Sequence, residues 1–214
     1  MIIRSTRAFG AALFLLLLAG CGGNTNETLS PVSATVPENA FSESSPYTGA
    51  NYETPLPPVA FVLSADAAGP LGSTPAYSSS EVKSRMPGYE TVTAETALEN
   101  KVYPTLAVLS DGQQVLQLFK GAGGRASEVH AVSGVVAGPA GEQVGMTFRQ
   151  AGLSRSNCRV GQNLWRGMAV CPSKKASNVS LVFALPGYRG PYTQMPNEKM
   201  IGDATLQRIV WKPR

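Results

Sequence analysis

The feature that most limits the possible folds is a series of short apolar runs that begins after Pro58. These runs are rich in β-branched residues and are separated by Gly, Pro, Asp and Asn, which is typical of strands joined by turns. Asp111-Gly112 suits a hairpin turn, because Asp-Gly accepts the positive φ that such turns require. The predicted strands are Val59–Ala65, Tyr103–Leu109, Val115–Phe119, Glu128–Val136, Gly167–Cys171, Asn178–Leu185 and Thr205–Trp211.

Two short helices are predicted between these strands. Ser78, followed by Glu81 three residues later, forms a capping box ahead of Val82–Met86. Thr147 is expected to cap a second helix over Phe148–Leu153. Strands joined by turns, with only these helices, predict an α+β fold in which an antiparallel sheet carries short helices packed on it.

The domain also contains a weak internal repeat that divides it into residues 58–127 and 128–214. If the repeat is real, the domain consists of two tandem helix-plus-sheet units that could share one extended sheet. The alternative is that the similarity arises by chance, because any α+β chain rich in Gly and Val contains segments that resemble one another. The matching segments are Ala68-Gly69-Pro70-Leu71-Gly72 with Ala137-Gly138-Pro139-Ala140-Gly141, Val115–Phe119 with Val179–Phe183, and Glu128–Val136 with Thr205–Trp211.

Residues 1–20 have the composition of a bacterial lipoprotein signal peptide. Arg4 and Arg7 precede an apolar run, Phe9–Leu18, that is too short to span a bilayer, which takes about 20 residues. Ala19-Gly20 before Cys21 matches the lipobox, whose cysteine is lipidated and becomes the new N-terminus. The alternative is an ordinary secretory signal with a cysteine at its cleavage site.

The segment 21–57 is predicted to be the lipidated N-terminus and a flexible tether. From Gly22 to Pro57 it is rich in Ser, Thr, Asn, Glu and Pro and has no periodic apolar run, so it cannot bury a core. A flexible coil of this length would reach about 30 to 35 Å. The folded domain is therefore expected over 58–214, held at some distance from the membrane.

Lipidation of Cys21 would leave two of the three cysteines, Cys158 and Cys171, as a pair in an oxidising compartment. A disulfide between them is predicted, and two free buried thiols are the alternative. Zinc would require about four Cys or His ligands, and the chain adds only His130 to this pair, so no metal site and no cofactor are predicted.

Charge and catalytic residues exclude several function classes. The formal charge of +4, part of which lies in the signal segment, is too small to indicate a nucleic-acid partner. A serine or cysteine triad needs a base, and His130 is instead predicted to be a satisfied or surface residue of a strand. Glu90, Glu95 and Glu99 are expected to be solvated loop charges, and residues 121–124 a flexible glycine-rich turn.

Aromatic and arginine side chains near the cysteine pair are the candidate recognition residues, because Trp, Tyr and Arg carry much of the energy at binding surfaces. Trp165 and Arg166 lie in the predicted disulfide-closed loop. Tyr188, Arg189 and Tyr192 lie in a loop punctuated by Gly and Pro. The alternative is that Trp165 and Tyr192 only close the end of the sheet.

A set of motifs over about the last 80 residues, together with the lipobox, completes the pattern. In order, they are Val144-Gly145-Met146-Thr147-Phe148, Cys158, Cys171, Gly190-Pro191, Met195-Pro196 and Ile209-Val210-Trp211. Their order and spacing resemble the RpoE-regulated lipoproteins of Gram-negative bacteria. The longer tether departs from the pattern of that family.

The resemblance implies an envelope lipoprotein under extracytoplasmic stress control, in a family whose domain has no known function, and it assigns no catalytic residue. Gly22 is not the aspartate that typically retains lipoproteins in the inner membrane, so the resemblance implies the periplasmic face of the outer membrane.

Three functions follow as hypotheses. The first is a non-enzymatic lipoprotein that is attached to the membrane by its lipid and binds another envelope component, expected to be a protein. The second is an inhibitor of an attacking enzyme such as a lysozyme. The third is an envelope hydrolase that uses carboxylates alone and therefore needs two acidic residues in one cleft.

Overall fold

The structure is a computed structural model that describes residues 55–98, 101–185 and 187–214. The predicted signal peptide, Cys21 and nearly all of the predicted tether lie outside these ranges. Within them, no helix has the length and hydropathy that a membrane span requires.

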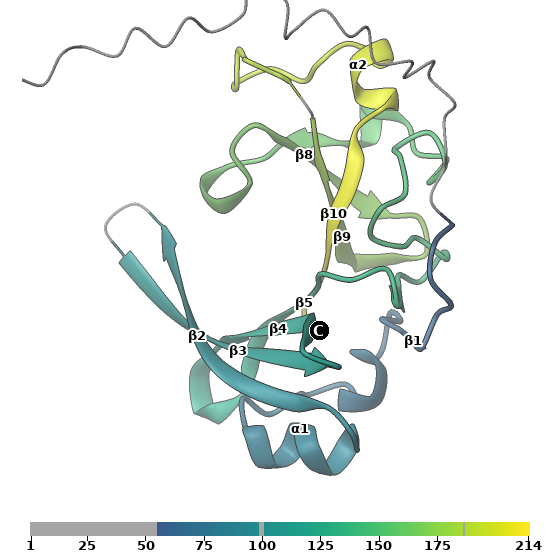
Figure 1. The fold of residues 1–214 in the computed structure, drawn as a ribbon. Coiled ribbons are helices and arrows are strands. Elements are labelled where there is room, and N and C mark those ends of the chain that lie inside the picture. The colour runs from purple at the N-terminus through teal and green to yellow at the C-terminus, as the bar shows by residue number, and fades with distance from the viewer. Residues whose placement is uncertain (1–54, 99–100, 186) are drawn as a thin grey trace, which may run out of the picture. The chain divides into compact units, whose positions relative to one another are not determined.

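An eight-stranded antiparallel sheet forms the centre of the domain and confirms the predicted fold class. Figure 1 shows the sheet strongly curved, with β2, β3 and β4 crossing its lower part and β8, β9 and β10 in its upper part. In spatial order the strands are β2 (Glu90–Leu98), β3 (Lys101–Ser110), β4 (Gln113–Lys120), β5 (Ala126–Ala131), β10 (Thr205–Trp211), β9 (Ala176–Ala184), β8 (Met168–Ser173) and β7 (Arg159–Val160).

The strand order has the same pattern in both halves of the domain. Each half contributes a meander of four strands, β2 to β5 and β7 to β10, and the last strands of the two meanders pair in the middle, with Val210 opposite His130. Two short strands that precede the meanders, β1 (Phe61–Val62) and β6 (Val136–Ala137), pair in parallel. This arrangement fits a sheet that is shared by two similar units, but the duplication itself stays a prediction. The expected boundary between the units, after residue 127, falls inside β5.

The helix predictions are half right. Helix α1 (Ser79–Arg85) forms where the capping box predicts it, and the Ser78 hydroxyl accepts a hydrogen bond from the backbone N–H of Glu81. The predicted helix Phe148–Leu153 is wrong. Thr147 does accept a hydrogen bond from the Gln150 backbone N–H, but only one turn follows before Gly152 adopts a φ of +61°.

Other short elements were not predicted. Helix α2 (Glu198–Gly202) begins at Asn197, whose side chain caps the Met200 backbone N–H. Four 3₁₀ turns occur in the described chain: η1 (Gly69–Leu71), η2 (Ala122–Gly124), η3 (Arg155–Asn157) and η4 (Asn163–Trp165).

Two strand predictions need correction. The predicted strand Glu128–Val136 is interrupted after Ala131, because the Val136 N–H bonds to the carbonyl of Ser133 in a turn before β6 begins. Strand β2 was missed, and it places Glu90 and Glu95 in a strand and not in a loop. The remaining predicted strands form with shifted ends, and Val59–Ala65 shortens to Phe61–Val62.

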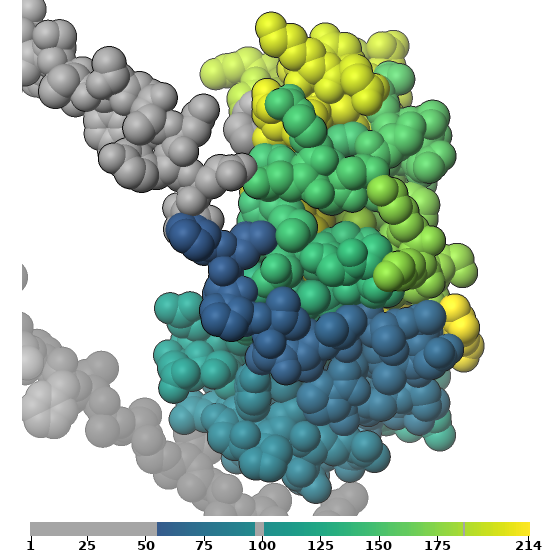
Figure 2. Space-filling model, turned by 90° about the vertical axis from the view of Figure 1, so that its right-hand side faces the viewer, coloured from purple at the N-terminus to yellow at the C-terminus, as the bar shows by residue number. Residues whose placement is uncertain are grey.

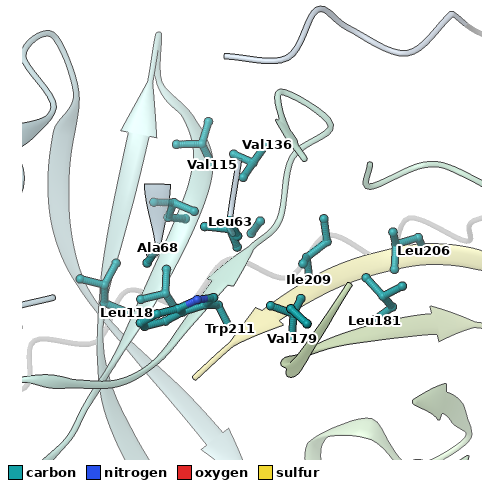
Figure 3. Packing of buried hydrophobic residues seen from close by; sticks show 14 of the residues in the cluster. Leu63, Ala68, Val115, Leu118, Val136, Val179, Leu181, Leu206, Ile209 and Trp211 are labelled. Carbon is teal, nitrogen blue, oxygen red and sulfur yellow. The ribbon is translucent and has the colours of Figure 1, made fainter. Parts of the chain in front are cut away.

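The main core lies on one face of the sheet and includes side chains from both halves (Figure 3). Trp211, Leu118 and Leu181 are almost fully buried, and the Trp211 indole N–H donates to the carbonyl oxygen of Ser64 at 2.9 Å. The first described residues lie against the second half, since the Leu63 N–H bonds to the Ala137 carbonyl. Figure 2 shows this segment in dark blue against green atoms of the chain's middle part.

The predicted disulfide forms between Cys158 and Cys171, with an S–S distance of 2.06 Å. Cys171 is buried in the main core, whereas Cys158 precedes the edge strand β7. The bond therefore ties the edge of the sheet and the loop before β8 to the interior.

Candidate ligand-binding cleft

The face of the sheet opposite the main core carries a second, smaller apolar cluster. Val170, Val182 and Val210 form this cluster, and the partly buried Trp165 and Met168 pack against it. These valines alternate with main-core residues along their strands, as expected for a sheet that is covered on both faces.

Beside this second cluster the face is hollowed by a cleft of about 470 Å³, a volume within the range of small-molecule sites. Both halves of the domain contribute: β3, β4 and β5 from the first, β7 and the residues around η4 from the second. The cleft is lined by Tyr103, Pro104, Phe119, Lys120, Ser127, Glu128, Arg159, Gln162, Asn163, Leu164 and Trp165.

Strand register sets the wall of the cleft in the first half. Phe119 pairs with Thr105 on one side and with Glu128 on the other, so these three side chains share a face. Tyr103 precedes Thr105 by two residues and therefore belongs to the same face. The result is an aromatic surface that ends at the Glu128 carboxylate.

The opposite wall is the turn η4 inside the disulfide-closed loop. Gly161 permits this turn, because a Cβ at that position would collide with the backbone carbonyl group of Trp165. Asn163 has a φ of +52°, which Asn tolerates better than most residues. The loop between Cys158 and Cys171 thus supplies five of the lining residues from one constrained segment.

Trp165 is held at the cleft by aromatic and cationic neighbours. The His130 ring lies 5.5 Å from the Trp165 ring and 4.3 Å from that of Phe119. The Arg208 guanidinium lies over the Trp165 ring at 5.7 Å and donates a 2.6 Å hydrogen bond to Gln117 Oε1. Such cation–π and ring contacts fix the orientation of an indole that is only partly buried.

Glu128 and His130 form a polar pair in the floor of this region. Glu128 accepts a hydrogen bond from His130 Nε2 at 2.8 Å and forms an ion pair with Lys212 Nζ at 2.7 Å. Partial burial alone would raise the Glu128 pKa, but these contacts outweigh it and lower the pKa to about 2. Burial lowers the pKa of His130, and its Nδ1 has no hydrogen-bond partner among the described residues.

Positive charge exceeds negative charge around the cleft. Lys120 and Arg159 are exposed lining residues, and neither forms an ion pair within the described part of the chain. Arg208, beneath Trp165, hydrogen-bonds only a neutral amide. The one lining carboxylate, Glu128, is already neutralised by Lys212.

The predicted recognition residues separate into two places. Trp165 lines the cleft and also packs on the second apolar cluster. Its role in recognition stays a prediction. Arg166, Tyr188 and Tyr192 gather outside the lining, with Arg166 over the Tyr192 ring at 5.9 Å and Tyr188 edge-on to that ring at 5.9 Å. Arg189 is exposed and does not line the cleft.

Sequence reasoning missed most of the cleft residues, including Tyr103, Phe119, Lys120 and Arg159. A signal was present: polar residues occur within otherwise apolar strands at positions opposite to the main core. Because such polar residues occur in strands of both meanders, they indicate that the second face of the sheet is also packed or functional. The polar positions are Gln117, His130 and Arg208.

The cleft contains no hydrogen-bonded catalytic chain among its described residues. Ser127 donates its hydroxyl to the Phe119 carbonyl oxygen and not to His130. Glu90 and Glu95 are exposed on β2 and do not line the cleft, and Glu99 lies outside the described residues. No group of three or more metal-ligating side chains occurs within the described ranges.

Comparison with known proteins shows a similar fold in a solved structure. The chain is similar to the crystal structure of the uncharacterized protein YfeY from Escherichia coli, with a TM-score of 0.56 and 14% sequence identity. The match covers 73% of this chain and 99% of that protein, and it shows a shared fold. No curated protein matches the chain.

A family model described as a protein of unknown function, DUF1131, matches residues 69–213, which is well over half of the sequence. The chain therefore belongs to the DUF1131 family of proteins of unknown function.

Proposed function

We propose that this chain is a lipid-anchored, non-enzymatic envelope protein that binds another envelope component in the cleft between its two halves. The observation that carries the proposal is the composition of the cleft, which combines three aromatic side chains with two cations that form no ion pair with other described residues, Lys120 and Arg159. Aromatic residues and arginine dominate the energy of binding sites. Tyr103 and Trp165 stand on opposite walls, so an occupant would contact both halves at once.

The cellular location in this proposal rests on the sequence. The lipobox at Cys21 would place the protein on a membrane, and the absence of Asp at position 22 favours the outer membrane. The motifs that resemble RpoE-regulated lipoproteins add control by envelope stress. Labelling with a radioactive or alkyne-bearing fatty acid tests the anchor, since Cys21→Ser should abolish incorporation.

The chemistry of the cleft supports binding more than hydrolysis. A carboxylate-only hydrolase needs a second acid and a general acid whose pKa is raised, whereas Glu128 has a lowered pKa and is bound by Lys212. The positive charge of the cleft also disfavours inhibition of a basic lysozyme, because like charges repel. Both alternatives can be tested directly, by hydrolysis of labelled peptidoglycan and by a lysozyme-inhibition assay.

Site-specific photocrosslinking tests the proposed function. A photoreactive amino acid is introduced at Gln162, an exposed lining residue in extended backbone, and at Lys174, an exposed residue of the β8–β9 turn that does not line the cleft. Specific adducts at residue 162 but not at residue 174, in cells that carry the lipidated protein, are expected. Equal crosslinking at both positions, or none at residue 162 in a correctly sorted protein, would contradict the proposal.

A further inference from the structure

The ligand chemistry can be inferred from the charges that the cleft leaves uncompensated. Lys120 comes from the end of β4 in the first half, and Arg159 comes from β7 in the second. Both side chains line the same cleft, and neither has a carboxylate partner within the described residues. An occupant that reaches both would therefore contact two cations from opposite walls.

A third cation reinforces the same sign of charge. Arg208 is partly buried beneath Trp165 and hydrogen-bonds to the neutral Gln117 side chain. A partly desolvated guanidinium with no acidic partner contributes a positive potential that is less screened by water than that of an exposed side chain. The potential at the cleft thus attracts an anion even though the Glu128–Lys212 pair nearby is neutral overall.

The walls of the cleft indicate the chemistry of the uncharged part of the ligand. Tyr103, Phe119 and Trp165 offer planar apolar surfaces on two sides. Planar rings stack favourably on such side chains. The exposed amides of Gln162 and Asn163 provide hydrogen bonds at the rim.

We propose that the cleft binds an organic carboxylate with a flat apolar ring: the carboxylate contacts Lys120 and Arg159, and the ring lies between Tyr103 and Trp165. This inference rests on the proposed function and adds the chemical class of the ligand. The volume of about 470 Å³ accommodates a compound of the size of an aromatic amino acid together with its neighbours in a short peptide.

The test uses two probes that differ only in charge. N-acetyl-L-phenylalanine carries the carboxylate and the ring, whereas N-acetyl-L-phenylalaninamide carries the ring without the charge. The chain contains two tryptophans, so its nitrogen-15 NMR spectrum has two indole signals. Trp165 reports on the cleft, and the buried Trp211, bonded to Ser64, serves as an internal control.

The carboxylate probe is expected to shift the Trp165 signal saturably and to leave the Trp211 signal in place. The amide is expected to bind several-fold more weakly. Lys120→Gln and Arg159→Gln should each weaken the carboxylate probe about two- to fivefold, the range typical of exposed ion pairs, and should not change binding of the amide. Lys174→Gln is the matched control and should change neither.

Three results would overturn the inference. One is equal binding of the two probes, another is an absence of any Trp165 shift at millimolar concentrations of both, and the third is unchanged carboxylate binding in the Lys120→Gln and Arg159→Gln variants. The source of the ligand is distinguished by photocrosslinking at Gln162 in the full-length protein: the absence of adducts in a protein that binds the free probe indicates a small molecule, and an adduct that the free probe competes away indicates a carboxylate on a larger component.

The two proposals fail in different ways. If adducts at residue 162 persist in the Lys120→Gln/Arg159→Gln double variant, the cleft still binds an envelope component and only the inferred anion is wrong. If adducts are absent while the carboxylate probe still binds Trp165, the ligand class stands and the envelope partner is wrong.

Discussion

Removal of the Cys158–Cys171 disulfide should both destabilise the domain and disorganise the cleft. The two cysteines are 13 residues apart, and closing a loop of this length stabilises a fold by about 3 kcal/mol on the chain-entropy model. For a domain of this size, that loss corresponds to a fall in Tm of about 6 to 12 °C. The same loop carries Arg159 and Trp165, so the wall of the cleft should loosen with it.

The assay compares urea unfolding of the oxidised protein, the reduced protein and the Cys158→Ala/Cys171→Ala variant. Reduction removes only the crosslink, whereas the variant also removes sulfur atoms from the buried Cys171 site. The reduced protein should lose about 3 kcal/mol and show a larger m-value, because its unfolded chain exposes more surface. A loss below about 1 kcal/mol with an unchanged m-value would refute this account of the loop.

Three further predictions concern single side chains. Glu128→Gln should be less stable than the wild type at pH 7, because a carboxyl with a lowered pKa stabilises the fold while it is ionised. The difference in Tm between the two proteins should vanish as the pH falls from about 4.5 towards 2, where the wild-type carboxyl becomes protonated. A Tm difference that is independent of pH would contradict this. Leu181→Ala, at a fully buried position, should cost about 2 to 5 kcal/mol in urea unfolding, and a loss below about 1 kcal/mol would show that the core relaxes around it. Gly161→Ala should shift the Trp165 indole signal and weaken probe binding, because the new Cβ collides with the backbone of residue 165; an unmoved signal would show that the turn does not depend on this glycine.

The fold class was predictable because apolar alternation survives in most of the strands. Strands such as β4 and β10 pack on both faces and therefore stand out as apolar runs. Strand β2 was missed because it is an edge strand of Thr, Ala and Glu, whose exposed side chains carry no apolar pattern. Its existence follows from pairing with β3, which is information that local sequence does not contain.

The candidate site was less predictable than the fold. Trp165 is a candidate from sequence alone because Trp carries much of the energy at binding surfaces and this residue lies in the predicted disulfide-closed loop. Lys120 and Arg159 gain significance only when the sheet curves and brings β4 and β7 to one cleft. The alternation of Gln117 and His130 with core residues was visible, but it did not indicate which strands would share the face.

The central position of β10 has a consequence for the order of folding. The strand lies between β5 and β9, so the backbone pairing that joins the two meanders in the described sheet runs through its last strand in the sequence. Each meander consists of neighbouring hairpins that can form early, whereas the pairing of β5 with β10 closes a loop of more than 70 residues. Because the chain is synthesised from its N-terminus, the sheet can be completed, and its open edges on β5 and β9 covered, only after Trp211 has emerged. A chaperone that binds the incomplete sheet would cover these open edges until β10 has paired with β5 and β9.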